Sequence, residues 1–335
     1  MKLAAICFTA AGQALGCRLT GPLQKQGVVY SLTAGFGPGK TSLRVWTDAA
    51  WRESNALLFI GAAGIAVRAI APLVASKTRD PAVLVMDEAG RFCIPLLSGH
   101  IGGANALARR IAGVCGAQVV LTTATDVRGM FAVDSWAVAQ GLTVANPERI
   151  QGVSSKLLAG GEVLLSSEFS IAGVLPAGVR LCALEETPDV AVSIYTRKDR
   201  ALLLIPRAVT LGIGCRRGIA AESLETAWQS LLQRTHLAPE AVRAVRSIDL
   251  KKEEPGLLAF CKRHQWPLQT FSAETLRALP GHFTASDFVA SVTGVDNVCE
   301  RAAVCGGGQL LLPKVAEKGV TMALGLFPVQ LYFPK

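Results

Sequence analysis

Short apolar runs alternate with helix-like patterns along most of this 335-residue chain. Runs such as 56–60 (ALLFI) and 82–86 (AVLVM) are apolar at every position, which is typical of strands buried on both faces of a parallel sheet. The helical patterns between such runs supply the crossover connections that parallel strands need. Expected strands of the first third are 3–8, 27–32, 56–60, 82–86 and 118–121, and expected helices are 13–19, 65–71 and 102–112. The alternation predicts an α/β protein.

The pattern changes in the middle of the chain. Residues 189–207 (DVAVSIYTRKDRALLLIPR) indicate two strands joined by a polar turn, and hence a smaller α+β region. The alternation returns after residue 208, with Ser272 as the expected N-cap of a further helix. Expected strands there are 209–213, 242–250 and 268–271, and expected helices are 219–234 and 257–263. We therefore expect two α/β domains with mainly parallel sheets, 1–130 and 207–335, flanking a smaller α+β central domain, 131–206.

Charge and cysteine usage exclude several classes of function. The net charge is +9, but Lys and Arg are scattered and aromatic residues make up only 6% of the chain. This favours a small acidic ligand over a nucleic acid, whose readers concentrate basic residues or interleave them with aromatic rings. The nine cysteines form no Cys-x-x-Cys pair, which argues against a zinc site or a disulfide framework. The apolar run 54–67 is too short to cross a bilayer, and we expect a soluble cytoplasmic protein without a signal peptide.

The most distinctive stretch is the glycine-rich segment 98–105 (SGHIGGAN), which leads into a helix. Glycines let backbone N–H groups approach a ligand closely, and a helix N-terminus attracts anions. His100 could act there as a general acid or base, donate to an oxyanion, or ligate a metal that the substrate brings. A helix-capping turn whose histidine bonds a backbone carbonyl is the structural alternative.

Acidic side chains follow two of the expected strands. Glu88 lies in 85–90 (VMDEAG), and Asp126 and Arg128 lie in 122–130 (TTATDVRGM). Ligands of open α/β sheets bind at the carboxyl ends of the strands, so we expect the loop 122–130 to lie near His100. Asp126 could orient the imidazole or cap a helix, and Glu88 could share acid and base work or lie exposed in a turn.

The C-terminal third holds a second group of candidates. Residues 211–218 (LGIGCRRG) indicate a strand, a glycine turn with Gly212 and Gly214, and a helix, but the spacing departs from the dinucleotide fingerprint. Arg216 and Arg217 could clamp a carboxylate or phosphate. A nucleophilic Cys215 is disfavoured because no histidine or acid lies near it in sequence. Glu300 and Lys314 could hold a polar substrate or form a surface pair, and the remaining histidines are interpreted as structural.

Taken in order, several of these stretches resemble one family. The segments GAAGIAVRAIAPLV, DEAGRFCIPLLSGHIGGANALARRIA, TTATDV, GIGCRRG and GVTMALG are similar to the CbiG family of cobalamin biosynthesis, the cobalt-precorrin-5A hydrolases of the anaerobic vitamin B12 route. The resemblance implies hydrolytic opening of the substrate's δ-lactone and release of the C20 unit as acetaldehyde, giving cobalt-precorrin-5B. It also implies that the substrate carries the cobalt, so that no protein-bound cofactor or metal is needed. Residues 295–304 (VDNVCERAAV) depart from the family pattern, which leaves the role of Glu300 open.

This chemistry assigns expected roles. Lactone opening creates an oxyanion and needs a base for water, and a histidine has an intrinsic pKa of about 6.5, suited to both directions of proton transfer. We expect His100 as the acid or base, with Asp126 or Glu88 as the orienting or second acid group. The expected substrate-binding residues are Ser98, Gly99, Gly102, Gly103, Asn105, Arg128, Gly212, Gly214, Arg216, Arg217, Glu300 and Lys314.

Two other functions remain open from the sequence. The chain could be a non-catalytic corrinoid carrier, which would bind the tetrapyrrole and release no acetaldehyde. A nucleotide-dependent enzyme that uses the turn 212–218 is disfavoured by the missing phosphate-binding fingerprints. Transient contacts with neighbouring pathway enzymes are possible, and the oligomeric state is left open.

Overall fold

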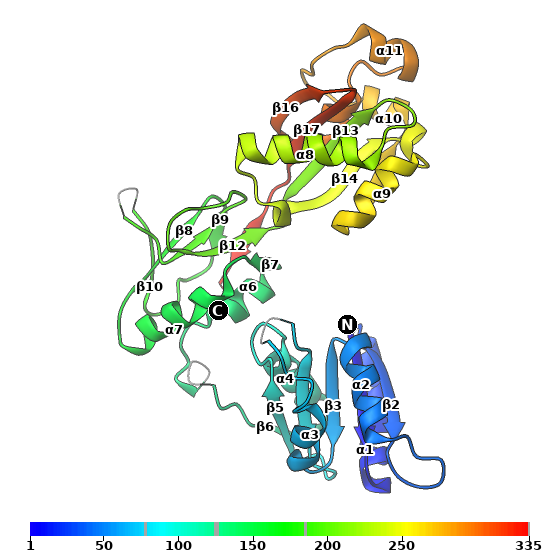
Figure 1. Ribbon diagram of the computed structural model, residues 1–335. Helices are drawn as coiled ribbons and strands as arrows, with labels where there is room; N and C mark the ends of the chain where they lie inside the picture. The colour runs from blue at the N-terminus through cyan, green and yellow to red at the C-terminus, as the bar shows by residue number, and fades with distance from the viewer. Residues whose placement is uncertain (77–78, 124–126, 184–185, 334–335) are drawn as a thin grey trace. The chain divides into compact units, whose positions relative to one another are not determined.

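A computed structural model describes residues 1–333 apart from 77–78, 124–126 and 184–185. The chain divides into two compact units, Met1–Ala139 with Ile150–Gly161, and Gln140–Arg149 with Glu162–Lys335. The strands form a six-stranded sheet, two five-stranded sheets and a two-stranded ribbon (Figure 1). Most strand pairs in the three large sheets are parallel, which confirms the predicted α/β class. The predicted domain boundaries stay a prediction.

The first sheet has the order β2-β1-β3-β4-β5-β6. Two apolar cores cover its faces, one beneath α1 and α4 and the other containing side chains of α2 and α3. Its strands are β1 (Lys2–Cys7), β2 (Val29–Ala34), β3 (Ala56–Ile60), β4 (Ala82–Met86), β5 (Phe92–Leu97) and β6 (Gln118–Val119). The helices of this unit are α1 (Ala10–Lys25), α2 (Leu43–Glu53), α3 (Ala63–Ile70), α4 (Ala104–Cys115), α6 (Val133–Ala139) and α7 (Ile150–Leu158). The predicted strands 56–60 and 82–86 have the observed bounds, whereas α2 and β5 were not among the predicted elements.

Strand β5 reverses the direction of this sheet. β1, β2, β3 and β4 are mutually parallel, β5 pairs antiparallel with β4, and β6 runs parallel to β5. The connection 87–91 is too short for a crossover, so only a hairpin can join β4 to β5. Asp87 stabilises that turn by accepting from the Phe92 amide at 2.7 Å. The carboxyl end of β5 therefore lies at the edge where β1, β3 and β4 begin.

The second sheet has the order β10-β8-β11-β12-β7, in which β7 alone is antiparallel to its neighbour. The two strands that the sequence places in 189–207 are present, but they pair in parallel and not as a hairpin. Between them the chain leaves the sheet, and Tyr195 forms a β-bridge with Leu237; this excursion makes parallel pairing possible. The strands are β7 (Leu142–Val144), β8 (Val163–Ser167), β10 (Val179–Leu181), β11 (Val190–Val192) and β12 (Leu202–Pro206). The ribbon pairs β9 (Ser170–Ala172) with β18 (Gln330–Tyr332).

The third sheet has the order β15-β14-β13-β17-β16. Its core packs Trp228 of α8 and Phe260 of α9 against the sheet. Its strands are β13 (Val209–Cys215), β14 (Val242–Ile248), β15 (Leu268–Phe271), β16 (Gln309–Glu317) and β17 (Val320–Leu326). The helices are α8 (Ala221–Thr235), α9 (Pro255–His264), α10 (Ala273–Arg277), α11 (Asp287–Thr293) and α12 (Val298–Val304), with short 3₁₀ turns at Pro147–Arg149, Pro239–Ala241 and Asp249–Lys251. Ser272 caps α10 by accepting from the Thr275 amide, as predicted.

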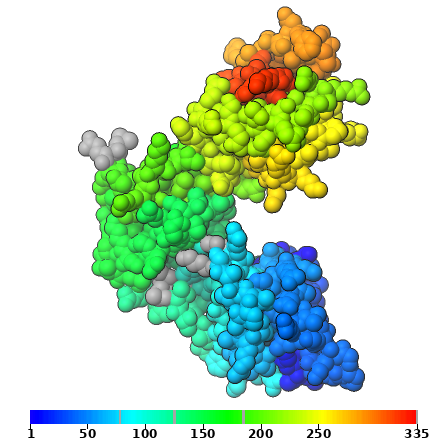
Figure 2. All heavy atoms as spheres, in the orientation of Figure 1, coloured from blue at the N-terminus to red at the C-terminus, as the bar shows by residue number. Residues whose placement is uncertain are grey.

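Helix α11 belongs to the surface of this unit. The orange segment of Figure 2 contains it, and its Phe288 and Val292 side chains are exposed. Among the described residues, the helices are all too short or too polar to cross a bilayer.

Candidate functional site

The segment 98–105 forms a tight turn between β5 and α4. Ser98 adopts a left-handed backbone conformation, with φ 54°, and its hydroxyl donates to the carbonyl of Asp80 at 3.0 Å. A side chain at Gly102 is excluded because its Cβ would lie 2.3 Å from Ser98 Cβ, and Gly103 has φ 80°. These glycines are therefore required by the shape of the turn.

Several amides of the turn are already used within it. The Ala104 amide donates to the Ser98 carbonyl, the Asn105 amide to Gly99 and the Gly103 amide to His100, at 2.9–3.1 Å. These three N–H groups are engaged at the start of α4, where the sequence suggested an anion site. An oxyanion at this turn would need other donors.

The imidazole of His100 contacts a carboxylate that the sequence reasoning missed. Nδ1 of His100 lies 3.1 Å from both carboxylate oxygens of Asp134. The two side chains are largely buried, at 13% and 11% exposure. A carboxylate at this distance favours the tautomer with the proton on Nδ1, so Nε2 is the nitrogen that carries the lone pair. The pair has the geometry of an oriented general base.

Local sequence explains how Asp134 is held. It lies in the first turn of α6, and its Oδ1 accepts from the Ser135 amide at 2.9 Å. Val133 and Trp136 of the same helix are buried, and Phe131 packs edge-on against Trp136 with ring centroids 5.9 Å apart. Carboxylates are common near helix N-termini, because they interact favourably with the positive end of the helix dipole. The position of Asp134 in the sequence therefore does not mark it as a histidine partner.

The loop after β6 reaches the same turn. The Asn105 amide group donates to the Thr123 hydroxyl at 3.3 Å, and Gly99 leaves room for it, because a Cβ there would lie 2.7 Å from Asn105 Oδ1. Thr123 of the loop 122–130 thus lies beside the His100 turn, as expected. Asp126 lies outside the described residues, so its role stays a prediction. Arg128 donates to the Leu158 carbonyl at 3.3 Å.

Glu88 does not lie at this edge, which corrects the expectation that it could assist His100. It follows β4, whereas His100 follows the antiparallel β5, and the register pairs Met86 with Cys93 and Val83 with Leu97. Glu88 and His100 therefore lie at opposite ends of β4, a strand in which each residue adds about 3.3 Å of length. Glu88 instead accepts from the Thr9 hydroxyl at 2.5 Å, at the opposite edge of the sheet.

Gly212 and Gly214 lie within β13, so the expected glycine turn is wrong. A Cβ at Gly212 would lie 1.9 Å from the Cys299 carbonyl oxygen, and one at Gly214 would lie 2.5 Å from Thr321 Oγ1. Glycine is therefore needed for close packing of α12 and β17 against the strand. A contact of either glycine with substrate stays a prediction.

The turn proper begins after Cys215 and carries both predicted arginines. Arg216 and Arg217 are exposed, and beside them the Gly218 amide donates to Glu254 at 2.8 Å. A hydrogen bond from Lys251 lowers the pKa of Glu254, with a smaller contribution from Arg217. The two arginines are accessible to an anionic ligand.

Burial raises the pKa of Cys215 to about 11. A thiol that stays protonated near neutral pH is a poor nucleophile. This agrees with the expectation that Cys215 is not catalytic.

Glu300 and Lys314 are joined through the Lys314 backbone amide and not as a surface ion pair, and a contact of Lys314 with substrate stays a prediction. The Glu300 carboxylate is buried, at 1% exposure. It accepts from the Lys314 amide at 2.6 Å and from the amide and hydroxyl of Thr284 at 2.8 Å. The Lys314 ammonium donates to the Thr284 carbonyl at 3.2 Å. The carboxylate therefore fastens the segment around Thr284 to β16.

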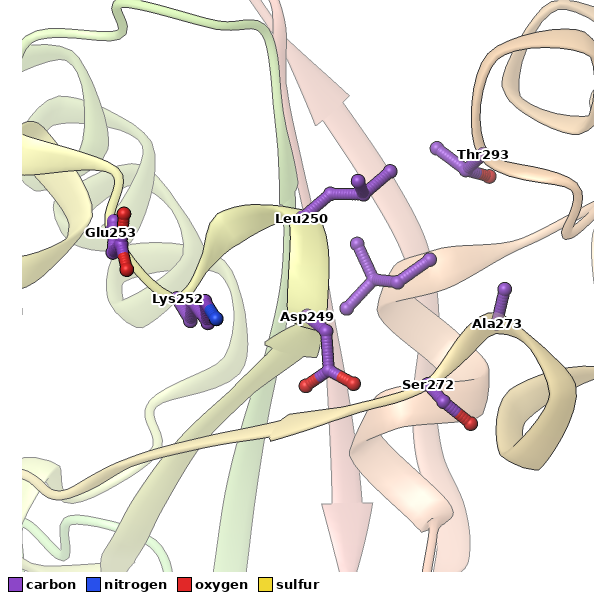
Figure 3. A pocket seen from close by; sticks show the side chains of 8 residues that line it. Asp249, Leu250, Lys252, Glu253, Ser272, Ala273 and Thr293 are labelled. Carbon is purple, nitrogen blue, oxygen red and sulfur yellow. The ribbon is translucent and has the colours of Figure 1, made fainter.

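A cavity of about 540 Å³ opens at the carboxyl ends of β14 and β15, the place where open α/β sheets bind ligands. Figure 3 shows Leu250 pointing toward Thr293 across it, with Asp249 and Ser272 below. It is lined by Ile248, Asp249, Leu250, Lys252, Glu253, Ser272, Ala273 and Thr293. No pattern in the sequence marks this cavity, because its lining comes from three segments that lie apart in the chain.

One phosphate-loop-like stretch also escaped the sequence reasoning. Residues 34–41 (AGFGPGKT) match the phosphate-loop spacing except that alanine occupies the first glycine position. In phosphate loops the Lys-Thr pair opens the helix, but here α2 begins only at Leu43 and Ser42 makes no side-chain cap. Lys40 is exposed, and β2 is an edge strand. The geometry therefore gives no support to a nucleotide-dependent enzyme.

Comparisons with known proteins agree on one family. The N-terminal family model of cobalamin synthesis G matches residues 45–126, and the C-terminal model matches residues 209–325. A cobalt-precorrin-5A hydrolase from Salmonella typhimurium is 38% identical over 97% of this chain and 97% of its own length. A cobalt-precorrin-5A hydrolase from Priestia megaterium is 31% identical over 86% of this chain and 82% of its own. Protein CobE from Sinorhizobium sp is 32% identical over 35% of this chain and 78% of its own. The chain therefore belongs to the cobalamin synthesis G family.

Proposed function

We propose that this chain is a cobalt-precorrin-5A hydrolase of cobalamin biosynthesis. The observation that carries the proposal is the 38% identity to the Salmonella typhimurium hydrolase, which extends over 97% of both chains. The oriented pair of His100 and Asp134 supplies a base of the kind that hydrolysis requires. The substrate brings its own cobalt, so the reaction needs no resident metal or cofactor.

The proposed first step is hydrolysis of the δ-lactone. Nε2 of His100 takes a proton from water, whose oxygen attacks the lactone carbonyl carbon. The ring C–O bond then breaks, and the imidazolium returns the proton to the alkoxide, leaving a carboxylic acid and a hydroxyl group. Asp134 holds the imidazole in place and stabilises its charged form during the transfer.

The proposed second step releases the C20 carbon with its methyl group. A base removes the proton of the new hydroxyl group, the carbonyl of acetaldehyde forms, and the single carbon–carbon bond that joins this unit to the macrocycle breaks. The macrocycle keeps the pair of bonding electrons and takes up one proton, giving cobalt-precorrin-5B. His100 suits this step as well, because it is neutral again after the first.

Peripheral contacts complete the proposal. Arg128, Arg216, Arg217 and Lys314 bind carboxylate arms of the macrocycle, and Asp126 assists His100. The exposure of Arg216 and Arg217 supports their part in this proposal.

The proposal also covers domain organisation and localisation. In chain order, two α/β domains, 1–130 and 207–335, stand on either side of a smaller central domain, 131–206, and the protein works in the cytoplasm.

The test is the release of acetaldehyde by the purified full-length protein from cobalt-precorrin-5A. We expect one equivalent of acetaldehyde for each cobalt-precorrin-5B formed. A protein that binds the substrate tightly but releases no acetaldehyde would instead be a corrinoid carrier, and the hydrolase proposal would be overturned.

A further inference from the structure

Two arginines of β14 meet on one aromatic ring. Arg246 is buried, at 7% exposure, and its guanidinium carbon lies 4.5 Å from the Phe327 ring centroid and 5.7 Å from that of Phe271. The guanidinium carbon of the exposed Arg243 lies 5.2 Å from the same Phe327 centroid. The guanidinium groups of Arg243 and Arg246 are thus both in contact with the Phe327 ring.

A β-bulge accounts for this meeting. Residues three apart in a regular strand point to opposite faces of the sheet. The register passes from Val242 opposite Val209 directly to Ala244 opposite Thr210, so Arg243 is an extra residue in β14. Bulges of this kind redirect a side chain, and here the bulge brings Arg243 to the ring that Arg246 contacts.

The hydrogen-bond partners of Arg246 are neutral. Nε donates to the Gln269 side-chain oxygen at 2.9 Å, and Nη1 donates to the Cys305 carbonyl. Within the described part of the chain, no carboxylate forms an ion pair with Arg246. Burial, and after it the charge of Arg243, lowers the pKa of Arg246. The buried charge therefore has neutral partners but no anionic one, and an ion buried without a counter-ion is costly in a protein interior.

Arg301 in the same unit is a buried arginine that does have a carboxylate partner. It is similarly buried, at 9% exposure, and it also lies over a ring, 4.4 Å from the Phe283 centroid. Its guanidinium, however, makes two hydrogen bonds to Asp296, at 2.7 and 3.1 Å. Arg246 has the ring and the neutral acceptors but lacks the anion.

We propose that Arg243 and Arg246 form a binding site for a carboxylate, and that this carboxylate is an acetate or propionate arm of the tetrapyrrole substrate. The ligand class rests on the proposed function. Guanidinium groups bind carboxylates with paired hydrogen bonds, and the exposed Arg243 guides the arm to the buried charge. The site lies at the start of β14, at the opposite edge of the sheet from Arg216 and Arg217.

Steady-state kinetics of R243Q test the site, with R234Q as the control. Arg234 is an exposed cation in the last turn of α8, so both variants lose one surface charge. We expect R243Q to raise KM for cobalt-precorrin-5A about tenfold with kcat unchanged, since one charge-assisted contact is lost. An equal KM for R243Q and R234Q would overturn the proposal.

Replacing Arg246 itself would remove its hydrogen bond to the Cys305 carbonyl and could prevent folding. A second variant therefore tests the site through Arg243 instead. R243E places a carboxylate beside Arg246 and supplies the missing anion from within the chain. We expect a higher Tm than for R243Q, and a KM at least as high. A Tm for R243E at or below that of R243Q would contradict an unpaired charge at this site.

Direct binding separates this proposal from the proposed function. Uroporphyrin, a tetrapyrrole with acetate and propionate groups, serves as the probe, with its methyl ester and inorganic phosphate as comparisons. We expect wild type to bind the acid about tenfold more tightly than R243Q does, and the ester equally with both. This result would uphold the carboxylate site even if wild type released no acetaldehyde. Equal binding of the acid by both, or a difference seen only with phosphate, would overturn it.

Discussion

Nδ1 of His100 lies 3.1 Å from the carboxylate of Asp134, and both side chains are largely buried. The two residues come from different elements, the turn after β5 and the first turn of α6. This contact makes His100, in the glycine-rich turn, a candidate general base. It also gives His100 a defined tautomer, on which the proposed hydrolysis depends.

Replacing Asp134 by Asn should impair chemistry far more than binding. Asparagine cannot stabilise an imidazolium, and its amide can favour the wrong tautomer. We expect kcat for acetaldehyde release to fall about a hundredfold or more, with KM nearly unchanged. D134E, which keeps the charge, should retain more activity than D134N. Equal activity of D134N and wild type would show that the contact is only structural.

Gly102 and Gly113 form a matched pair for testing the His100 turn. Alanine at 102 would clash with Ser98, whereas a Cβ at Gly113, within α4, meets nothing within 4 Å. We expect G102A to lower the free energy of unfolding by about 1–3 kcal/mol and to reduce activity. G113A should raise it by about 0.5–1 kcal/mol, because alanine favours the helix. Urea unfolding of both variants measures this, and a stable, fully active G102A would contradict the described turn.

The pair of Asp296 and Arg301 predicts a pH-dependent contribution to stability. The hydrogen bond from Arg301 holds the pKa of Asp296 below its usual value, so the carboxylate stabilises the folded state above its unfolded pKa. This stabilisation is lost as pH falls through the lowered pKa, because Asp296 is then protonated in both states. D296N should cost about 1–2 kcal/mol at pH 7, less than for a fully buried pair, since the Asp296 side chain is 38% exposed.

Unfolding measured from pH 7 to pH 2 checks this prediction. The difference in stability between wild type and D296N should shrink as the pH falls below about 4. A difference that stays constant over that range would mean that the carboxylate charge does not contribute.

Buried strands could be predicted well from the sequence. The runs 56–60 and 82–86 match β3 and β4 residue for residue, because an apolar run between turn residues has few other structures open to it. Strand β5 and the reversal of direction that it brings were not predicted, although the short polar turn 87–91 between two apolar runs is a hairpin signal. That one error put Glu88 at the same edge as His100.

Other parts of the site depend on contacts between distant residues. Asp134 becomes a partner of His100 only through packing of α6, and Gly212 is required by Cys299, which lies in a helix far along the chain. The Arg243 bulge is set by the register of β13 and β14. Local patterns can identify the chemistry that His100 offers, but not the partners that tertiary structure brings to it.

Single-turnover release of acetaldehyde by His100→Ala tests the central claim most directly. Wild type and H100A are each mixed in excess with cobalt-precorrin-5A, substrate binding is confirmed, and acetaldehyde is followed over time. The proposed mechanism predicts that H100A binds the substrate but releases acetaldehyde about a hundredfold more slowly or worse. Release by H100A at the wild-type rate would contradict the account.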